Sequence, residues 1–190
     1  MVSLFNRARA QRFYHLHDEM RQVVAIQPPL QVPRQGEPPA DLVARLAEFK
    51  AASVAAREAG ALVIGSDQVA VLDTEILGKS GNHERAVAQL GRASGRTVSF
   101  FTGLCLLDSD SGRRQVEVVP FRVVFRPLTL AQIESYLRRE QPYQCAGSFK
   151  SEGLGIVLFE RLEGEDPSSL IGLPLIRLIR MLEAEGIQVV

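Results

Sequence analysis

A polar interruption inside an apolar run is the feature that most constrains this 190-residue chain. Residues 61–72 read ALVIGSDQVAVL, which predicts two strands, around 61–65 and 68–72, with a carboxylate between them. An unpaired buried charge is costly, so Asp67 requires a partner, a metal ion or water. The alternative is a bulge at Gly65-Ser66 that turns Asp67 outward into solvent.

The chain from residue 41 onward alternates helical and strand patterns. Helices are expected from Asp41 to about Arg57 and over 83–93, where Asn82 caps the second helix. A third is expected from Thr129 to about Glu140. The last should begin after Asp166-Pro167 and run towards Glu185, with a break at Pro174. Strands are expected over 97–107 and 114–126, joined by a turn at 108–112, and over 156–160. Helices that alternate with antiparallel hairpins favour a mixed α/β fold in one domain.

Composition excludes several partners. Acidic and basic residues balance at 22 each, so no global positive field recruits a nucleic acid polymer or an anionic membrane. No apolar stretch approaches the length of a membrane span and the start does not read as a secretory signal, which makes the cytoplasm the expected compartment. Cys105 and Cys145 are expected to be reduced, mostly buried thiols.

Lysines that could converge on Asp67 are the residues that a polyphosphate-binding site needs. Lys50 sits late in the helix expected from Asp41 to about Arg57, Lys79 closes the LGK turn, and Ser148-Phe149-Lys150-Ser151-Glu152 lies between glycines. Lysines neutralise phosphate oxygens, and a carboxylate binds Mg²⁺ or takes a proton from water. Each of these residues alone is more often a solvated side chain, and the sequence has no Walker motif, zinc-ligand spacing or nucleophile elbow.

Four strings together resemble the Maf family of nucleoside triphosphate pyrophosphatases, and within it the 7-methyl-GTP pyrophosphatase subfamily. They are LVARLAEFKA at 42–51, VIGSDQVAVLDTEILGK at 63–79, ASGRTVSFFTGL at 93–104 and CAGSFKSEGLGIVLFERLEGEDPSSLIGLPLI at 145–176. The resemblance covers residues 37 to about 186. It implies a curved mixed sheet flanked by helices, two lobes with a central cleft, and hydrolysis of a nucleoside triphosphate to its monophosphate and pyrophosphate.

The resemblance also implies roles for individual residues. Asp67 would be the catalytic proton acceptor and would bind a divalent cation, Mg²⁺ or Mn²⁺. Lys50 and Lys79 would hold the triphosphate or the surroundings of the attacking water. Gln68 and Glu152 match positions associated with base selection, and a carboxylate can accept hydrogen bonds from the guanine edge.

Further substrate contacts are expected from Ser148, Lys150 and Arg12. Arg12 is the nearest match to the arginine of the family's SxSPRR phosphate loop, but neither that loop nor the family's acidic pair is present, and Ser80 replaces the usual proline after LGK. Residues 1–36 are therefore an atypical arm, which has either diverged or been read in the wrong frame over about its first 30 residues.

Two other functions stay open at this stage. A chain without the phosphate loop could bind a nucleotide with little or no catalysis, and the apolar segment LIGLPLI at 170–176 could serve an interaction module. The expected partner in the favoured hypothesis is a small-molecule nucleotide, and a homodimer is left open.

Overall fold

A computed structural model describes residues 11–13, 22–25 and 34–190, with side chains from residue 34 onward. Its described strands form one seven-stranded sheet in the order β1-β2-β3-β5-β6-β7, with β4 paired to β3. The strands are β1 (Gln11–Phe13), β2 (Gln22–Ala25), β3 (Ala61–Leu72), β4 (Glu75–Leu77), β5 (Thr97–Asp108), β6 (Arg114–Phe125) and β7 (Phe159–Glu163). Strand β2 is parallel to β3 and the other pairs are antiparallel, so the predicted mixed α/β class is confirmed.

The prediction of two strands over 61–72 is wrong, because β3 is continuous. It pairs with β5 in one unbroken register, from Leu62 opposite Asp108 to Leu72 opposite Val98. A bulge would shift that register, so the bulge at Gly65-Ser66 is excluded. The polar residues occur where β3 has neighbours on both faces that can accept or donate hydrogen bonds.

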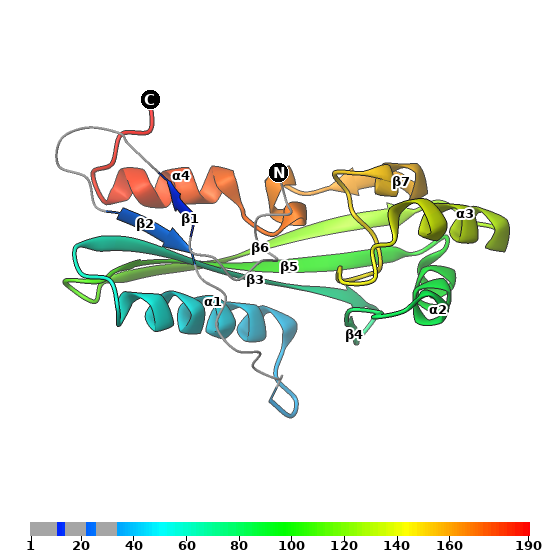
Figure 1. The fold of residues 1–190 in the computed structure, drawn as a ribbon, viewed down its shortest axis with the longest axis horizontal. Coiled ribbons are helices and arrows are strands. Elements are labelled where there is room, and N and C mark those ends of the chain that lie inside the picture. The colour runs from blue at the N-terminus through cyan, green and yellow to red at the C-terminus, as the bar shows by residue number, and fades with distance from the viewer. Residues whose placement is uncertain (1–10, 14–21, 26–33) are drawn as a thin grey trace.

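Helix α1 (Pro39–Ala55) covers one face of β3 and β5 (Figure 1). It begins at Pro39 rather than Asp41, because proline supplies the φ angle of a first helical turn and needs no amide partner there. Asp41 lies in that first turn, where its negative charge interacts favourably with the positive end of the helix dipole. The small residues Ala47 and Ala51 pack with Val63 and Cys105, which brings the helix close to the sheet.

The opposite face of the sheet carries the 3₁₀ helix η3 (Pro167–Ile171) and helix α4 (Leu175–Ala184) (Figure 1). Leu178 and Met181 of α4 pack on Leu62 and Leu104. The predicted break at Pro174 is confirmed, since this residue caps α4 and separates it from η3.

The buried carboxylate of Asp166 joins η3 to α4. One oxygen accepts a hydrogen bond from the Ser168 amide at 3.2 Å, and the other accepts one from the Ile176 amide at 2.8 Å. A charge placed at the starts of both helices is stabilised by their unpaired amide groups.

Helices α2 (His83–Ala93) and α3 (Leu130–Glu140) pack together at the other end of the long strands (Figure 1). Both predicted caps are confirmed, because the Asn82 side chain accepts from the Arg85 amide and Thr129 forms a capping box with Gln132. A core cluster that includes Leu90, Phe100, Phe125, Leu137 and Phe149 fills the space between these helices and the sheet.

The predicted strand over 156–160 begins later than expected. Residues Leu154–Leu158 form the 3₁₀ helix η2, and β7 follows from Phe159. Ile156 and Val157 are about half exposed, so their apolar character does not mark a buried strand. Gly155 instead lies against the backbone of Lys150, where an added Cβ would be 2.1 Å from the carbonyl oxygen.

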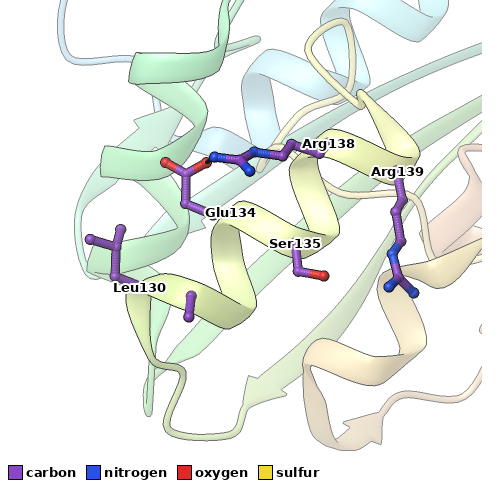
Figure 2. Close-up of a pocket in the computed structure, with 6 residues that line it drawn as sticks. Leu130, Glu134, Ser135, Arg138 and Arg139 are labelled. Carbon is purple, nitrogen blue, oxygen red and sulfur yellow. Dashed lines mark ion pairs between the residues drawn. The ribbon is translucent and has the colours of Figure 1, made fainter.

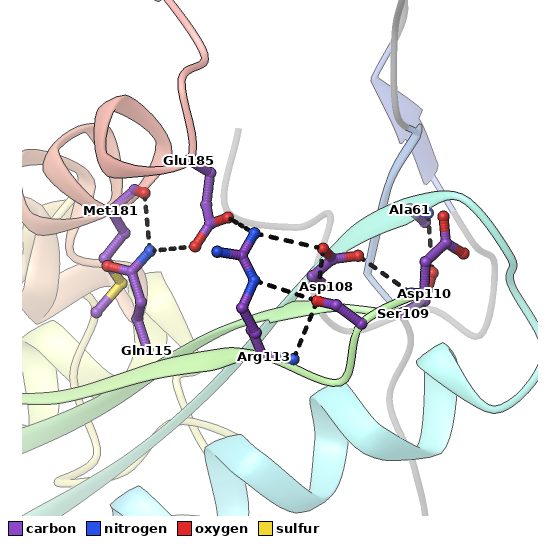
Figure 3. Close-up of polar contacts among 9 residues, drawn as sticks. Ala61, Asp108, Ser109, Asp110, Arg113, Gln115, Met181 and Glu185 are labelled. Carbon is purple, nitrogen blue, oxygen red and sulfur yellow. Dashed lines mark hydrogen bonds and ion pairs between the residues drawn. The ribbon is translucent and has the colours of Figure 1, made fainter.

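Polar contacts fasten the tip of the β5–β6 hairpin to α4 (Figure 3). Asp108 accepts hydrogen bonds from the Asp110 amide at 3.1 Å and the Ser111 hydroxyl at 2.8 Å, which shapes the predicted turn. Arg113 reaches Glu185 at 3.0 Å, and Gln115 bonds to the same carboxylate at 2.9 Å. The C-terminal helix is thereby held over the hairpin.

The atypical first 36 residues contain two described strands. The sequence predicts an extended arm there, and the structure pairs β1 with β2 and places β2 beside β3. The remainder of 1–33 lies outside the described residues. No helix in the part of the chain that is described combines the length and apolar character needed to cross a membrane.

Candidate active site

Lys50 and Asp67 form the centre of the candidate site. The Lys50 ammonium group makes an ion pair with Asp67 Oδ1 and donates a second hydrogen bond to the Ser66 carbonyl oxygen at 2.8 Å. Both side chains are about four-fifths buried, at 23% and 20% exposure. Asp67 therefore has the partner that its position requires, and helix α1 supplies it.

Glycine at position 65 permits this contact. A Cβ at Gly65 would lie 2.1 Å from the Ala47 carbonyl oxygen and 2.8 Å from the Ala51 amide nitrogen. The same holds one strand further, where a Cβ at Gly103 would lie 2.2 Å from the Val43 carbonyl oxygen. The two glycines let α1 lie directly on the sheet, so that Lys50 reaches Asp67.

Gln68 points to the opposite face of the sheet from Asp67, as neighbouring residues of a strand do. Its amide nitrogen donates to the Thr102 hydroxyl at 2.9 Å and to the Ser169 carbonyl oxygen at 2.6 Å. Thr102 donates to the same carbonyl at 3.0 Å. Gln68 is thus tied to η3 and is not brought together with Lys50; its role in base selection stays a prediction.

Lys79 and the segment 141–153 lie beside each other. Lys79 forms an isolated antiparallel bridge with Ala146, and the Gly81 amide donates to the Tyr143 carbonyl oxygen at 2.8 Å. Burial raises the pKa of Cys145, and the positive charges of Lys150 and Lys79 oppose that rise. The backbone contacts therefore hold Lys79 beside segment 141–153.

The residues of segment 141–153 differ in their accessibility. Ser148 is fully buried and donates its hydroxyl hydrogen bond to Gln89, whereas Glu152 is exposed and accepts one from Ser151 at 3.3 Å. The Lys150 ammonium group lies 3.4 Å from Glu140. Glu152 is the carboxylate of this segment that is open to a ligand.

Several contacts of the site were not predicted from the sequence. Gln89 bonds to Ser148, and Thr102 and Ser169 bond to Gln68, but each lies at least 34 positions away from its partner in the chain. No local pattern marks such residues. The side chain of Arg12, in β1, lies outside the described residues.

The donor atoms suit a cation that arrives with its substrate. Among residues 34–190, no group of three or more His, Cys, Asp and Glu side chains could hold a metal ion. Mg²⁺ commonly binds through one or two carboxylates and keeps substrate phosphates and water as its other ligands. Asp67 fits that use, with Lys50 as its neighbour.

Two surface depressions lie away from these residues. Figure 2 shows the first, of about 690 Å³, along α3, where Glu134 pairs with Arg138 beside Leu130. The second, of about 600 Å³, lies at the edge of β6 near Arg122 and Arg177. Neither is lined by Lys50, Asp67, Lys79 or Glu152, so we assign no catalytic role to them.

Comparison with known proteins points to one family. A family model described as "Maf-like protein" matches residues 8–185. A 7-methyl-GTP pyrophosphatase of Nitrosococcus oceani is 60% identical over 156 residues, covering 82% of this chain and 78% of the relative. Another protein of that name, from Alcanivorax borkumensis, is 57% identical over 154 residues, covering 81% of this chain and 78% of the relative.

Proposed function

The chain belongs to the Maf family, and on that premise we propose that it hydrolyses a nucleoside triphosphate, with 7-methyl-GTP as the favoured substrate, to the monophosphate and pyrophosphate. The single observation that carries the proposal for this chain is the ion pair of Lys50 with Asp67 in the partly buried middle of β3. The names of its two relatives supply the substrate.

Asp67 acts as the proton acceptor in this proposal. A water molecule beside its carboxylate loses a proton to Asp67 as its oxygen forms a bond to the α-phosphorus. The bond between the α-phosphorus and the bridging oxygen breaks, and the electron pair leaves with pyrophosphate. Lys50 orients the carboxylate and places positive charge where phosphate oxygens would gather.

The other predicted residues divide between the phosphates and the base. Lys79 is exposed next to segment 141–153 and can neutralise the leaving pyrophosphate. Glu152 is exposed on that segment, and its carboxylate can accept hydrogen bonds from the N1–H and exocyclic amine of guanine. Mg²⁺ or Mn²⁺, held by Asp67 and phosphate oxygens, would supply charge neutralisation when bound.

Asp67→Asn tests the assignment. It keeps the shape of the side chain and removes the base, so turnover of 7-methyl-GTP should fall by a factor on the order of 10² to 10⁴. Asp73→Asn is the matched control, because Asp73 is exposed just beyond β3 and asparagine accepts its positive φ of 55°. Release of pyrophosphate measures both variants, and near-normal turnover by folded Asp67→Asn refutes the role of Asp67.

A further inference from the structure

Gln89, on helix α2, contacts two separate segments of the candidate site. Its side-chain nitrogen donates to the Gly78 carbonyl oxygen at 3.1 Å, and its side-chain oxygen accepts from the Ser148 hydroxyl. A backbone carbonyl can only accept a hydrogen bond, which fixes the orientation of the amide. One side chain thus bridges two segments that lie about 70 positions apart in the sequence.

Both contacted residues stand within four positions of residues of the proposed site. Gly78 precedes Lys79, the proposed phosphate ligand, and Ser148 precedes Lys150 and Glu152. Ser148 has a positive φ of 59° and no solvent exposure. A non-glycine residue in that conformation is held by its surroundings, and its hydrogen bond to Gln89 is part of what holds it.

The two segments also meet through their backbones. The bridge between Lys79 and Ala146 and the bond from the Gly81 amide to the Tyr143 carbonyl lie beside the Gln89 contacts. His83, at the start of α2, bonds to the Tyr143 hydroxyl at 3.0 Å and to Glu134 of α3 at 2.9 Å. Helix α2 is therefore the common support of both segments.

We propose that Gln89 is a positioning residue that fixes the segment of Lys79 relative to the segment of Glu152, so that the phosphates and the base of one nucleotide are gripped together. The inference rests on the proposed function, and it adds a residue to which no role has been assigned. Gln89 itself touches no substrate in this scheme and acts through Gly78 and Ser148.

Two substitutions separate the parts of this contact. Gln89→Met keeps the length of the side chain and removes both hydrogen bonds. Gln89→Glu keeps an acceptor for Ser148 but loses the donor to Gly78. Arg92→Met is the matched control, because Arg92 lies one turn further along α2 and binds Glu75, which lies outside both segments.

The kinetic test compares a complete nucleotide with its phosphates alone. For Gln89→Met and Gln89→Glu, we expect the KM for 7-methyl-GTP to rise about tenfold and the preference for 7-methyl-GTP over UTP to shrink. The reason is that the Lys79 segment and the Glu152 segment would no longer be held at the spacing that fits the phosphates and the base of one nucleotide. Inhibition by inorganic tripolyphosphate, which engages the phosphate ligands alone, should change by no more than about twofold. Arg92→Met should behave as wild type in every assay.

A purely structural role would give a different result. The melting temperature would then fall while the KM for 7-methyl-GTP, the preference over UTP and tripolyphosphate inhibition stayed at wild-type values in the folded fraction, which would overturn the proposal. A parallel loss of nucleotide and tripolyphosphate binding would also overturn it, because Gln89 would then serve the Lys79 segment alone.

Hydrogen exchange keeps this inference separate from the proposed function. If wild-type protein hydrolyses no nucleotide, the proposed function fails, but the coupling of segments 78–81 and 143–150 is still measurable. Gln89→Met should speed amide exchange in both segments together, and Arg92→Met should leave both unchanged. Unchanged exchange in the Gln89→Met variant would overturn the positioning role whatever the activity of the wild type.

Discussion

Replacement of Gly65 by alanine tests how closely the candidate site depends on the contact between α1 and β3. The new Cβ would lie 2.1 Å from the Ala47 carbonyl oxygen, whereas non-bonded atoms settle at about 3.5 Å. Gly65 has an ordinary φ, so the substitution causes no backbone strain and the effect is one of space. The helix must withdraw by roughly 1 Å to make room.

The same displacement reaches Lys50, which lies between Ala47 and Ala51 in α1. The bond from Lys50 to the Ser66 carbonyl would lengthen from 2.8 Å to roughly 3.8 Å, beyond hydrogen-bond range. We expect Gly65→Ala to lower the free energy of unfolding by about 1–3 kcal/mol. Turnover should fall by about 10²-fold, because a misplacement of this size is costly in catalysis.

Two alanine substitutions provide the comparison. Gly91→Ala, on α2, meets no atom within 4 Å and should raise stability by about 0.5–1 kcal/mol without a change in turnover. Gly103→Ala would place its Cβ 2.2 Å from the Val43 carbonyl, about two turns from Lys50, so its cost should fall more on stability than on rate. Denaturant unfolding and pyrophosphate release measure all three. Wild-type turnover by folded Gly65→Ala would refute the reasoning.

Two other predictions concern base selection and pH. Glu152→Ala should cost roughly 1–3 kcal/mol of binding to 7-methyl-GTP and less to UTP, and an equal loss on both would show that Glu152 does not meet the base. Burial raises the pKa of Cys105 from 9.0 to about 11, so the stability that the neutral thiol contributes is complete below pH 9 and is lost as pH rises towards 11. The unfolding free energy of the wild type should therefore fall by roughly 2 kcal/mol relative to that of Cys105→Ala between about pH 9 and pH 11. A difference between the two proteins that does not change with pH would contradict the raised pKa of Cys105.

Local signals in the sequence determined several elements of the fold. Asn82 and Thr129 cap their helices through contacts only three residues away, and the turn after β5 closes through Asp108 and its near neighbours. Pro174 stands at the start of α4 and separates it from η3, as its own geometry favours. Such features depend on neighbours in the chain, and the sequence displays those neighbours directly.

The sequence also indicated that Asp67 needs a partner and, by resemblance, named Lys50. It did not predict that β3 is continuous, because that depends on unbroken pairing with β5, which follows later in the chain. By resemblance it also assigned Gln68 to base selection in the same site as Asp67. In the structure, neighbouring residues of a strand face opposite sides, and the Gln68 side chain bonds to η3.

Tertiary structure alone decided which residues hold the site together. The resemblance implies a substrate contact for Ser148, yet its hydroxyl is buried against Gln89, 59 positions earlier in the chain. Helical periodicity assigns Gln89 to α2 but gives no sign of the two segments that it joins. The physical reason is that caps and turns form between residues a few positions apart, whereas a bridge of this kind exists only after packing has brought distant backbones within hydrogen-bond distance.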